Sequence, residues 1–364
     1  MKHEDDFHFM SKALRLAKRG VGKVHPNPLV GAVLVKNNRI IGQGAHRKFG
    51  GPHAEREAIL NAKERVAAAT LYVTLEPCAH FGKTPPCADF ILKNKIKKVV
   101  VAARDPNPLV NGRGLGLLKK KGVRVVTGVM EKEATRLNRD FNHWIRKKMP
   151  YVTVKIAQSL DGKIATKHGE SRWITGDAAR RFGHRLRAFS DAVLVGANTV
   201  QNDDPLLSVR TAGPGRQPLK IILDSYLRVS PKARLFSKES PGPVMIAVTR
   251  KATVRRKSLF RGKAEIVECR EKNGKVDLGS LFRFLGRRGI VNLLVEGGGE
   301  TVGGVLSEKL AHEVYFFVAP LIIGGKNAVT SVGGEGISLL RDAVKIKDLE
   351  VRRIGRDFML HGTF

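Results

Sequence analysis

The chain has 364 residues, more than one ordinary domain holds, so two domains are expected. A hydrophobic content of 42% is enough for globular cores, and no run of 18 apolar residues is present, so no transmembrane helix and no membrane partner are expected. The acidic N-terminus lacks the apolar core of a signal peptide. Three cysteines do not suggest a disulfide framework, and this favours a reducing, cytoplasmic location.

The formal net charge of +33 is high, and both halves of the chain are basic. Nucleic-acid binding is one interpretation of such a balance. The other is a basic surface that helps to attract phosphorylated substrates. Because only 6% of the residues are aromatic, base stacking has little support, and no nucleic-acid partner is expected.

The first part of the chain alternates predicted helices and strands, a pattern typical of a layered α/β sheet. Asn37-Asn38 suits a tight hairpin turn between two strands. Met149-Pro150 marks the predicted domain boundary, which gives domains 1–149 and 150–364. The expected elements of the first domain are a helix at 5–19, strands at 29–35 and 70–75, helices beginning near His53 and Cys87, strands at 99–102 and 123–126, and a helix at 131–147.

Residues 53–87 carry a candidate zinc site. His53, Cys78 and Cys87 offer one imidazole and two thiols, and three such ligands leave the fourth position of a catalytic zinc to water. Glu55, two residues after His53, is placed to carry protons. This is the H-x-E and P-C arrangement of zinc deaminases, in which the Glu is an acid/base and not a ligand. A structural zinc is the alternative, but structural sites normally have four ligands.

The second part of the chain contains further predicted strands. They are expected at 151–157, 192–196, 219–223, 244–248, 291–295 and 313–318, with a helix at 177–188. Residues 296–301 form a glycine-containing turn from a strand to a helix, where backbone N–H groups can approach a phosphate. This turn is not the G-x-G-x-x-G dinucleotide fingerprint. Cys269 is expected to be a buried strand residue.

Two sets of motifs resemble one family, the bifunctional riboflavin-biosynthesis deaminase/reductases. In the first half these are Asn27-Pro28-Leu29-Val30-Gly31, Gly51-Pro52-His53-Ala54-Glu55 and the stretch from Pro77 to Cys87, whose eight-residue gap between cysteines is that family's spacing. In the second half they are Ser159-Leu160-Asp161-Gly162, Trp173-Ile174-Thr175-Gly176, Asp203-Asp204-Pro205 and Glu296-Gly297-Gly298-Gly299. The resemblance covers nearly the whole chain.

The resemblance implies a cytidine-deaminase-like α/β/α layer domain followed by a dihydrofolate-reductase-like domain with a mixed sheet. It also implies one zinc ion in the first domain and NADPH in the second. The implied substrate is 2,5-diamino-6-ribosylamino-4(3H)-pyrimidinone 5′-phosphate, which is deaminated hydrolytically and then reduced to the ribityl phosphate. A homo-oligomer is expected. An alternative hypothesis is a nucleic-acid-editing deaminase or an RNA-binding protein whose second half is catalytically inactive. The net charge and the zinc motif motivate this alternative.

The resemblance also assigns site residues. Asn27, His46, His80 and Lys83 are implied to contact the pyrimidine and its phosphoribosyl group. Lys155 and Asp203 are the catalytic candidates of the reductase. Ser171, Arg187, Leu207, Arg210 and Glu296 resemble substrate contacts, with Arg187 and Arg210 suited to the 5′-phosphate. The implied cofactor contacts are Ala157, Trp173, Thr199, Asp203, Ser225, Gly298, Gly299, Glu300, Thr301, Val302, Gly303 and Gly304. Asn198 departs from the family pattern, in which a glycine is expected before Thr199.

Overall fold

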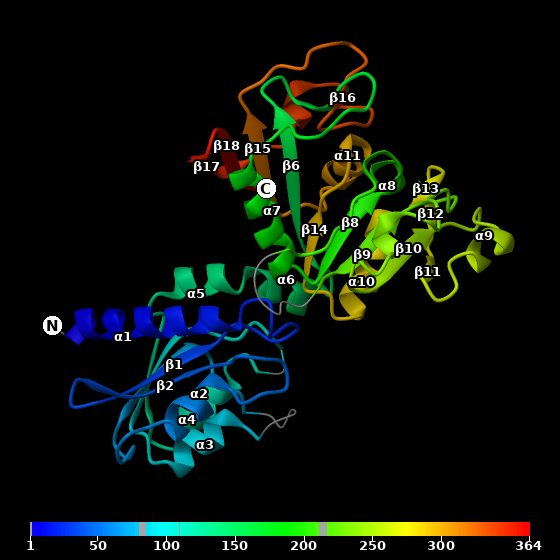
Figure 1. Ribbon diagram of the computed structural model, residues 1–364. Helices are drawn as coiled ribbons and strands as arrows, with labels where there is room; N and C mark the ends of the chain where they lie inside the picture. Colours follow the sequence, from blue (N-terminus) through cyan, green and yellow to red (C-terminus); the bar gives the residue numbers. More distant parts are fainter. Residues whose placement is uncertain (1, 80–84, 109, 211–216) are drawn as a thin grey trace. The chain divides into compact units, whose positions relative to one another are not determined.

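The computed structural model describes residues 2–79, 85–108, 110–210 and 217–364. It divides into two compact units, Met1–Lys148 and Met149–Phe364, and each is described by itself (Figure 1). The division lies one residue before the boundary expected from the sequence. Within the described ranges, we find no helix both long and apolar enough to cross a membrane.

Unit 1 is a five-stranded sheet with helices on both faces (Figure 1). The strand order is β2-β1-β3-β4-β5; β1 is antiparallel to β2 and β3, whereas β3, β4 and β5 are parallel. Its strands are β1 (Gly31–Lys36), β2 (Arg39–Ala45), β3 (Thr70–Leu75), β4 (Lys98–Ala103) and β5 (Arg124–Thr127). Its helices are α1 (Lys2–Ala17), η1 (Lys18–Gly20), α2 (Ala54–Leu60), α3 (Cys87–Lys93), α4 (Arg113–Lys120), α5 (Glu131–Leu137) and α6 (Arg139–Lys147).

Alternation along the strands gives unit 1 two cores. Leu34, Leu71 and Val99 face one side and pack with α2, α3 and α4, whereas Val33 and Val100 face the other side and pack with α1 and α5. Because successive strand residues point to opposite faces, a strand that is apolar on both faces needs helices on both sides. Unit 1 is therefore an α/β/α sandwich.

Unit 2 is built on a nine-stranded mixed sheet in the order β11-β10-β9-β8-β14-β6-β15-β18-β17. All neighbouring pairs from β11 to β15 are parallel, and β18 and β17 are added antiparallel at one end. The sheet strands are β6 (Tyr151–Ser159), β8 (Ala192–Gly196), β9 (Leu219–Leu223), β10 (Val244–Val248), β11 (Glu265–Glu268), β14 (Asn292–Val295), β15 (Glu313–Ala319), β17 (Lys347–Ile354) and β18 (Asp357–Thr363).

Helices cover both faces of this sheet as well. One core includes Phe282 of α10 and Val302 of α11, and the opposite face packs against α8 and, near β15, against α7. The helices are α7 (Asp177–Phe189), α8 (Ala197–Asp203), η2 (Arg234–Phe236), α9 (Val254–Ser258), α10 (Leu278–Arg287), α11 (Gly299–Ser307) and η3 (Leu340–Asp342). Two short strand pairs lie outside the main sheet: β7 (Lys163–Ala165) with β16 (Val329–Thr330), and β12 (Glu271–Lys272) with β13 (Lys275–Val276).

Two sequence-based expectations about local structure are wrong. The helix expected at 131–147 is two helices, because Asn138 leaves the helical conformation (φ −109°, ψ 24°). Its buried side chain accepts a hydrogen bond from Leu29 N and donates one to Leu29 O. Cys269 follows β11 instead of lying within it and is only half-buried. The hairpin β17/β18 and the short strands of unit 2 were not expected from the sequence.

Candidate active sites

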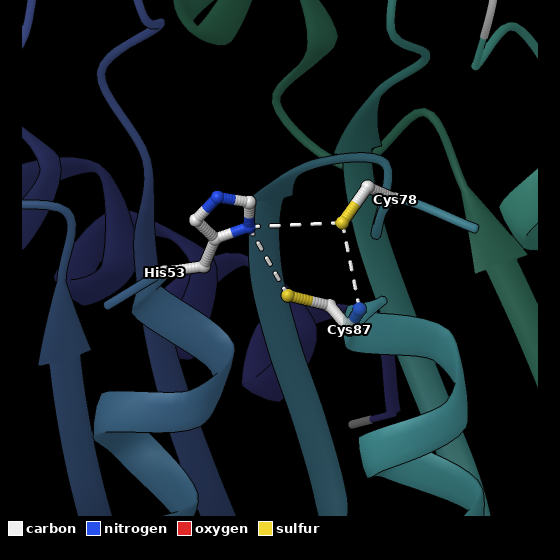
Figure 2. Close-up of side chains that lie close together, drawn as sticks. All are labelled: His53, Cys78 and Cys87. Atoms are coloured by element: carbon white, nitrogen blue, oxygen red, sulfur yellow. Dashed lines mark hydrogen bonds between the residues drawn. The ribbon is translucent and has the colours of Figure 1, made fainter. Parts of the chain in front are cut away.

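The three candidate zinc ligands of unit 1 meet where α2, β3 and α3 begin or end (Figure 2). His53 is the N-cap of α2, Cys78 follows β3, and Cys87 is the first residue of α3. His53 Nδ1 lies 3.2 Å from Cys87 Sγ and 3.7 Å from Cys78 Sγ, as the dashed lines in Figure 2 mark. The three candidate ligand atoms all lie within 4.8 Å of one another.

These spacings suit a tetrahedral zinc ion. With Zn–N bonds of about 2.1 Å and Zn–S bonds of about 2.3 Å, ligand atoms of a tetrahedron are roughly 3.6 Å apart. Hydrogen bonding with Cys87 lowers the pKa of the Cys78 thiol to about 4, so that one of the two sulfurs is held as a thiolate. The backbone N–H of Cys87 also donates to Cys78 Sγ over 3.4 Å. An imidazole nitrogen and a thiolate-forming pair of sulfurs are donors that zinc prefers.

Glu55 lies in the first turn of α2 and is only 4% exposed. Burial raises the pKa of its carboxyl group and so favours the protonated form. Its buried Oε2 has no hydrogen-bond partner among the residues that the structure describes. A buried polar atom that is unpaired within the protein is a reason to expect a water or a ligand beside it.

A cavity of about 350 Å³ contains this site. Its polar lining includes Asn27, His46, His53, Glu55 and Cys78. Asn27 Nδ2 donates to His46 Nε2 over 3.1 Å, and His46 Nδ1 therefore donates to Pro52 O over 2.9 Å. Burial lowers the pKa of His46, which agrees with this neutral form of the ring. The structure thus brings Asn27 and His46 to the zinc site; His80 and Lys83 lie outside the described residues.

Sequence reasoning missed several residues of this cavity. Asp105 and Asn107 line it from the loop after β4, and Phe141, Trp144 and Ile145 line it from α6. No local motif marks them, because they reach the zinc site only through the packing of the sheet and α6.

Glu76, directly before Pro77-Cys78, is not among the predicted site residues. Its buried carboxylate accepts backbone N–H groups from Gly112 (2.9 Å), Gly114 (3.1 Å), Leu115 (3.3 Å) and Asp105 (3.4 Å). Gly114 is required there, because a Cβ would lie 1.9 Å from Pro77 O. Glu76 therefore ties the strand end that carries Cys78 to the N-terminus of α4 and to the loop that lines the cavity.

In unit 2, most of the predicted site residues follow the carboxyl ends of parallel strands, where ligands bind in open α/β sheets. Glu296 follows β14, and Arg187 of α7 donates to it twice, from Nε to Oε1 (2.6 Å) and from an Nη to Oε2 (2.8 Å). Lys155 Nζ of β6 is 3.8 Å from Glu296 Oε2. Burial would raise the pKa of Glu296, but Arg187 and Lys155 outweigh it and hold the pKa at about 2. Burial lowers the pKa of Lys155.

A second set of contacts lies at the ends of β8 and β14. The Asp203 carboxylate accepts from Ser171 Oγ (2.9 Å), and its backbone carbonyl accepts from Arg172. Thr199 Oγ1 accepts from Gly298 N (3.0 Å), at the N-cap of α11. The structure therefore pairs Lys155 with Glu296, and Asp203 with Ser171.

The remaining predicted residues of unit 2 lie on several elements. Ser225 follows β9, where its Oγ accepts from Val276 N and its carbonyl from Thr249. Trp173 is 63% exposed, with the Arg180 guanidinium 4.5 Å from its ring centroid. Leu207 is buried and Arg210 is exposed. Ala157 lies on β6, and Gly299 to Gly304 form the first turns of α11. Asn198, the departure from the family pattern, accepts from Arg228 over 3.3 Å.

Comparison with known proteins identifies both units. Residues 150–360 match the family model of the RibD C-terminal domain, and residues 3–103 match that of the cytidine and deoxycytidylate deaminase zinc-binding region. The chain is 42% identical over 355 residues to the riboflavin biosynthesis protein RibD of Actinobacillus pleuropneumoniae, covering 98% of this chain and 94% of the relative. It is also 42% identical over 360 residues to the Aquifex aeolicus RibD, covering 99% of each.

The chain belongs to the RibD family. Solved structures of similar proteins support the same family assignment. That of a diaminohydroxyphosphoribosylaminopyrimidine deaminase/5-amino-6-(5-phosphoribosylamino)uracil reductase from Thermotoga maritima superposes with a TM-score of 0.89 at 38% identity, covering 100% of this chain and 99% of that one. A RibD structure from Acinetobacter baumannii superposes with the same TM-score at 38% identity and covers 99% of each chain.

Membership in the RibD family confirms the main sequence-based predictions. The chain is a bifunctional enzyme of riboflavin biosynthesis with a zinc-binding deaminase domain and a reductase domain. The predicted fold class, a cytidine-deaminase-like layer domain and a dihydrofolate-reductase-like domain with a mixed sheet, is also confirmed.

Proposed function

We propose that unit 1 deaminates 2,5-diamino-6-ribosylamino-4(3H)-pyrimidinone 5′-phosphate at a zinc ion held by His53, Cys78 and Cys87, and that unit 2 then reduces its ribosyl group with NADPH. The observation that carries the proposal is the clustering of these three ligands beside a cavity that His53, Cys78 and buried Glu55 line. When bound, zinc lowers the pKa of a water molecule so that it can attack carbon near neutral pH.

In the deamination, Glu55 carries the proton. As the bond between the water oxygen and C2 of the pyrimidine forms, Glu55 Oε2 accepts a proton from the water. As the bond between C2 and the amino nitrogen breaks, Glu55 returns the proton, and ammonia leaves. The raised pKa of Glu55 supports this double role. Asn27 and His46, which are hydrogen-bonded to each other beside the ligands, hold the pyrimidine.

The reductase site of unit 2 has groups that fit NADPH. Gly298 caps α11, whose first backbone N–H groups have no partner within the helix and favour a phosphate. Thr199, joined to Gly298, and Ser225 extend the proposed cofactor site to the ends of β8 and β9. NADPH supplies the hydride that reduces C1′ of the opened ribose.

The chain supplies the proton and the alignment for this reduction. Lys155 is the proposed proton donor, because burial lowers its pKa and so makes proton release easier near neutral pH. Glu296 holds the Lys155 ammonium group and orients Arg187. Asp203, joined to Ser171, is proposed to hold the sugar. The substrate contacts proposed for Leu207 and Arg210 rest on the resemblance.

Ammonia release and NADPH oxidation, measured on one sample, test the two-site proposal. Both signals should appear with the diaminopyrimidinone substrate, and a zinc chelator should stop both. The deaminated intermediate should then restore NADPH oxidation in the chelated sample. Loss of NADPH oxidation that the intermediate does not restore would contradict separate sites.

We also propose that the enzyme self-associates. β17 is the end strand of the nine-stranded sheet, and Leu349 and Val351 on it are 52% and 61% exposed. Apolar side chains at an open sheet edge favour pairing with the same strand of a second copy. Nearby in sequence, other large apolar side chains are exposed: Ile322, Val329, Val332, Ile337, Leu339, Leu340, Val344, Ile346 and Phe358.

A cytoplasmic location is part of the proposal, because Cys78 and Cys87 must stay reduced to bind zinc. The phosphorylated pyrimidine is the proposed partner of the basic surface, and no nucleic acid is proposed.

A further inference from the structure

One wall of the deaminase cavity is made by α6, a helix that carries none of the sequence motifs. Phe141, Trp144 and Ile145 line it there. The match to the deaminase zinc-binding region ends at residue 103, so α6 lies outside the part of the chain that this model describes. The cavity therefore combines a polar part, which carries the zinc ligands and Glu55, with an aromatic part supplied by a separate helix.

Contacts between two residue pairs fix α6 to the loop that carries Asn27. Asn138, directly before α6, accepts from Leu29 N over 2.7 Å and donates to Leu29 O over 2.9 Å. In the first turn of α6, Asp140 Oδ2 lies 3.1 Å from His25 Nε2. Contacts on both sides of Asn27 thus hold the aromatic side chains of α6 at a defined place relative to Asn27 and His46.

The position of the Trp144 ring is itself restrained. Its centroid lies 6.4 Å from that of Phe141, and Lys148 Nζ lies 4.7 Å from the ring centroid. An indole held by an aromatic neighbour and a cation loses little freedom when a ligand arrives, which favours binding. A flat, electron-rich ring in a cavity suits a flat heterocyclic ligand, because every such ligand has a face for stacking.

We propose that Trp144 is a substrate-binding residue of the deaminase, whose ring contacts the pyrimidine of the substrate. This inference rests on the proposed function. In this arrangement Glu55, Asn27 and His46 act at the edge of the heterocycle, and Trp144 binds its face. The contact is made in both the ground state and the transition state, so its loss weakens binding more than it slows the chemical step.

The first test separates KM from kcat for ammonia release. Trp144→Ala should raise KM about tenfold, whereas kcat should change less than about threefold, as for the loss of one stacking contact. Trp144→Phe keeps an aromatic ring and should stay within about threefold of the wild-type KM. Lys147→Ala is the control, since Lys147 is an exposed residue of α6 that does not line the cavity. Zinc content and melting temperature should match in all four proteins.

A second measurement does not depend on turnover. The sequence has two tryptophans, so Trp173→Phe leaves Trp144 as the sole tryptophan, which can be excited selectively over tyrosine. Adding the deaminated product should change its fluorescence, with saturation. An unchanged KM in Trp144→Ala, or unchanged emission at saturating product, would overturn the role of Trp144. In either case ammonia release by the wild-type enzyme would leave the proposed function standing, whereas its absence would refute that function.

Discussion

Arg187 and Glu296, 109 residues apart in the sequence, form a two-point ion pair in which Nε and an Nη donate to the two carboxylate oxygens at 2.6 and 2.8 Å. Both side chains are largely buried, and Lys155 Nζ is 3.8 Å from the same carboxylate. The pair joins α7 to the end of β14, and so it stabilises this part of unit 2 and positions two residues of the proposed reductase site.

The stability of unit 2 should therefore depend on pH through Glu296. Its pKa is about 2 in the folded protein and 4.5 in the unfolded reference, so the carboxylate stabilises the fold above about pH 4.5. As pH falls through about 2 this contribution is lost, and by linkage it amounts to about 3 kcal/mol. In urea unfolding measured between pH 5 and 2, the free energy of unfolding of the wild-type protein should fall by this amount. Glu296→Gln should lack this part of the pH dependence. Glu239→Gln, in an exposed ion pair with Arg234, should keep the wild-type profile.

Glu55→Gln should reduce the rate of ammonia release at least about 100-fold, because the amide cannot carry the proton. Zinc content, measured by atomic absorption, should be unchanged, since Glu55 is not among the proposed ligands. NADPH oxidation on the deaminated intermediate should also persist. Glu64→Gln, at an exposed position of unit 1, serves as the control. Ammonia release at the wild-type rate would remove Glu55 from the mechanism.

Lys155→Ala should reduce NADPH oxidation by about 100-fold or more, as expected for loss of a proton donor. Asp203→Ala should raise KM for the deaminated intermediate, since Asp203 is joined to Ser171 and is proposed to hold the sugar. Ammonia release should be normal in both variants. Lys326→Ala removes an exposed lysine of unit 2 and is the control. If both site variants oxidise NADPH normally, the proposed roles are wrong.

Glu76→Gln should lower the melting temperature of the deaminase unit, because the new NH₂ group faces backbone N–H donors. A buried group left unsatisfied costs about 1–3 kcal/mol. Ammonia release should fall as well, while NADPH oxidation on the intermediate serves as the internal control. Glu131→Gln, in the exposed first turn of α5, should be neutral. Wild-type melting and turnover in Glu76→Gln would show that the carboxylate charge is not needed there.

Self-association should depend on the exposed apolar residues of the C-terminal hairpin. Val351→Asp, on the end strand β17, should shift the molar mass measured by light scattering toward that of one chain, because burying an unpaired charge is unfavourable. Leu60→Asp alters an equally exposed side chain in unit 1 and should leave the mass unchanged. A single-chain mass for the wild-type enzyme would contradict the proposal.

Local sequence was sufficient to single out the candidate zinc ligands, which the structure brings together, and to predict several buried strands along the chain. His53, Cys78 and Cys87 each stand at the start or end of a helix or strand, and chemistry restricts what one imidazole and two thiols beside a glutamate can do. Apolar runs such as 192–196 and 244–248 predicted buried strands, because a strand covered on both faces has no polar alternation.

Tertiary structure alone decided which distant residues share a site. The carboxylate of Glu76 and the ring of Trp144 have no motif, since their roles depend on α4 and α6 packing around the end of β3. Asn138, where the expected helix is interrupted, is bonded through its side chain to the backbone of Leu29, 109 residues away, and no local pattern indicates this contact. Likewise, the pairing of Arg187 with Glu296 follows from the order of the strands in the sheet. Hydrophobic periodicity in the sequence indicates which side chains are buried, whereas such long-range contacts depend on the topology of the fold.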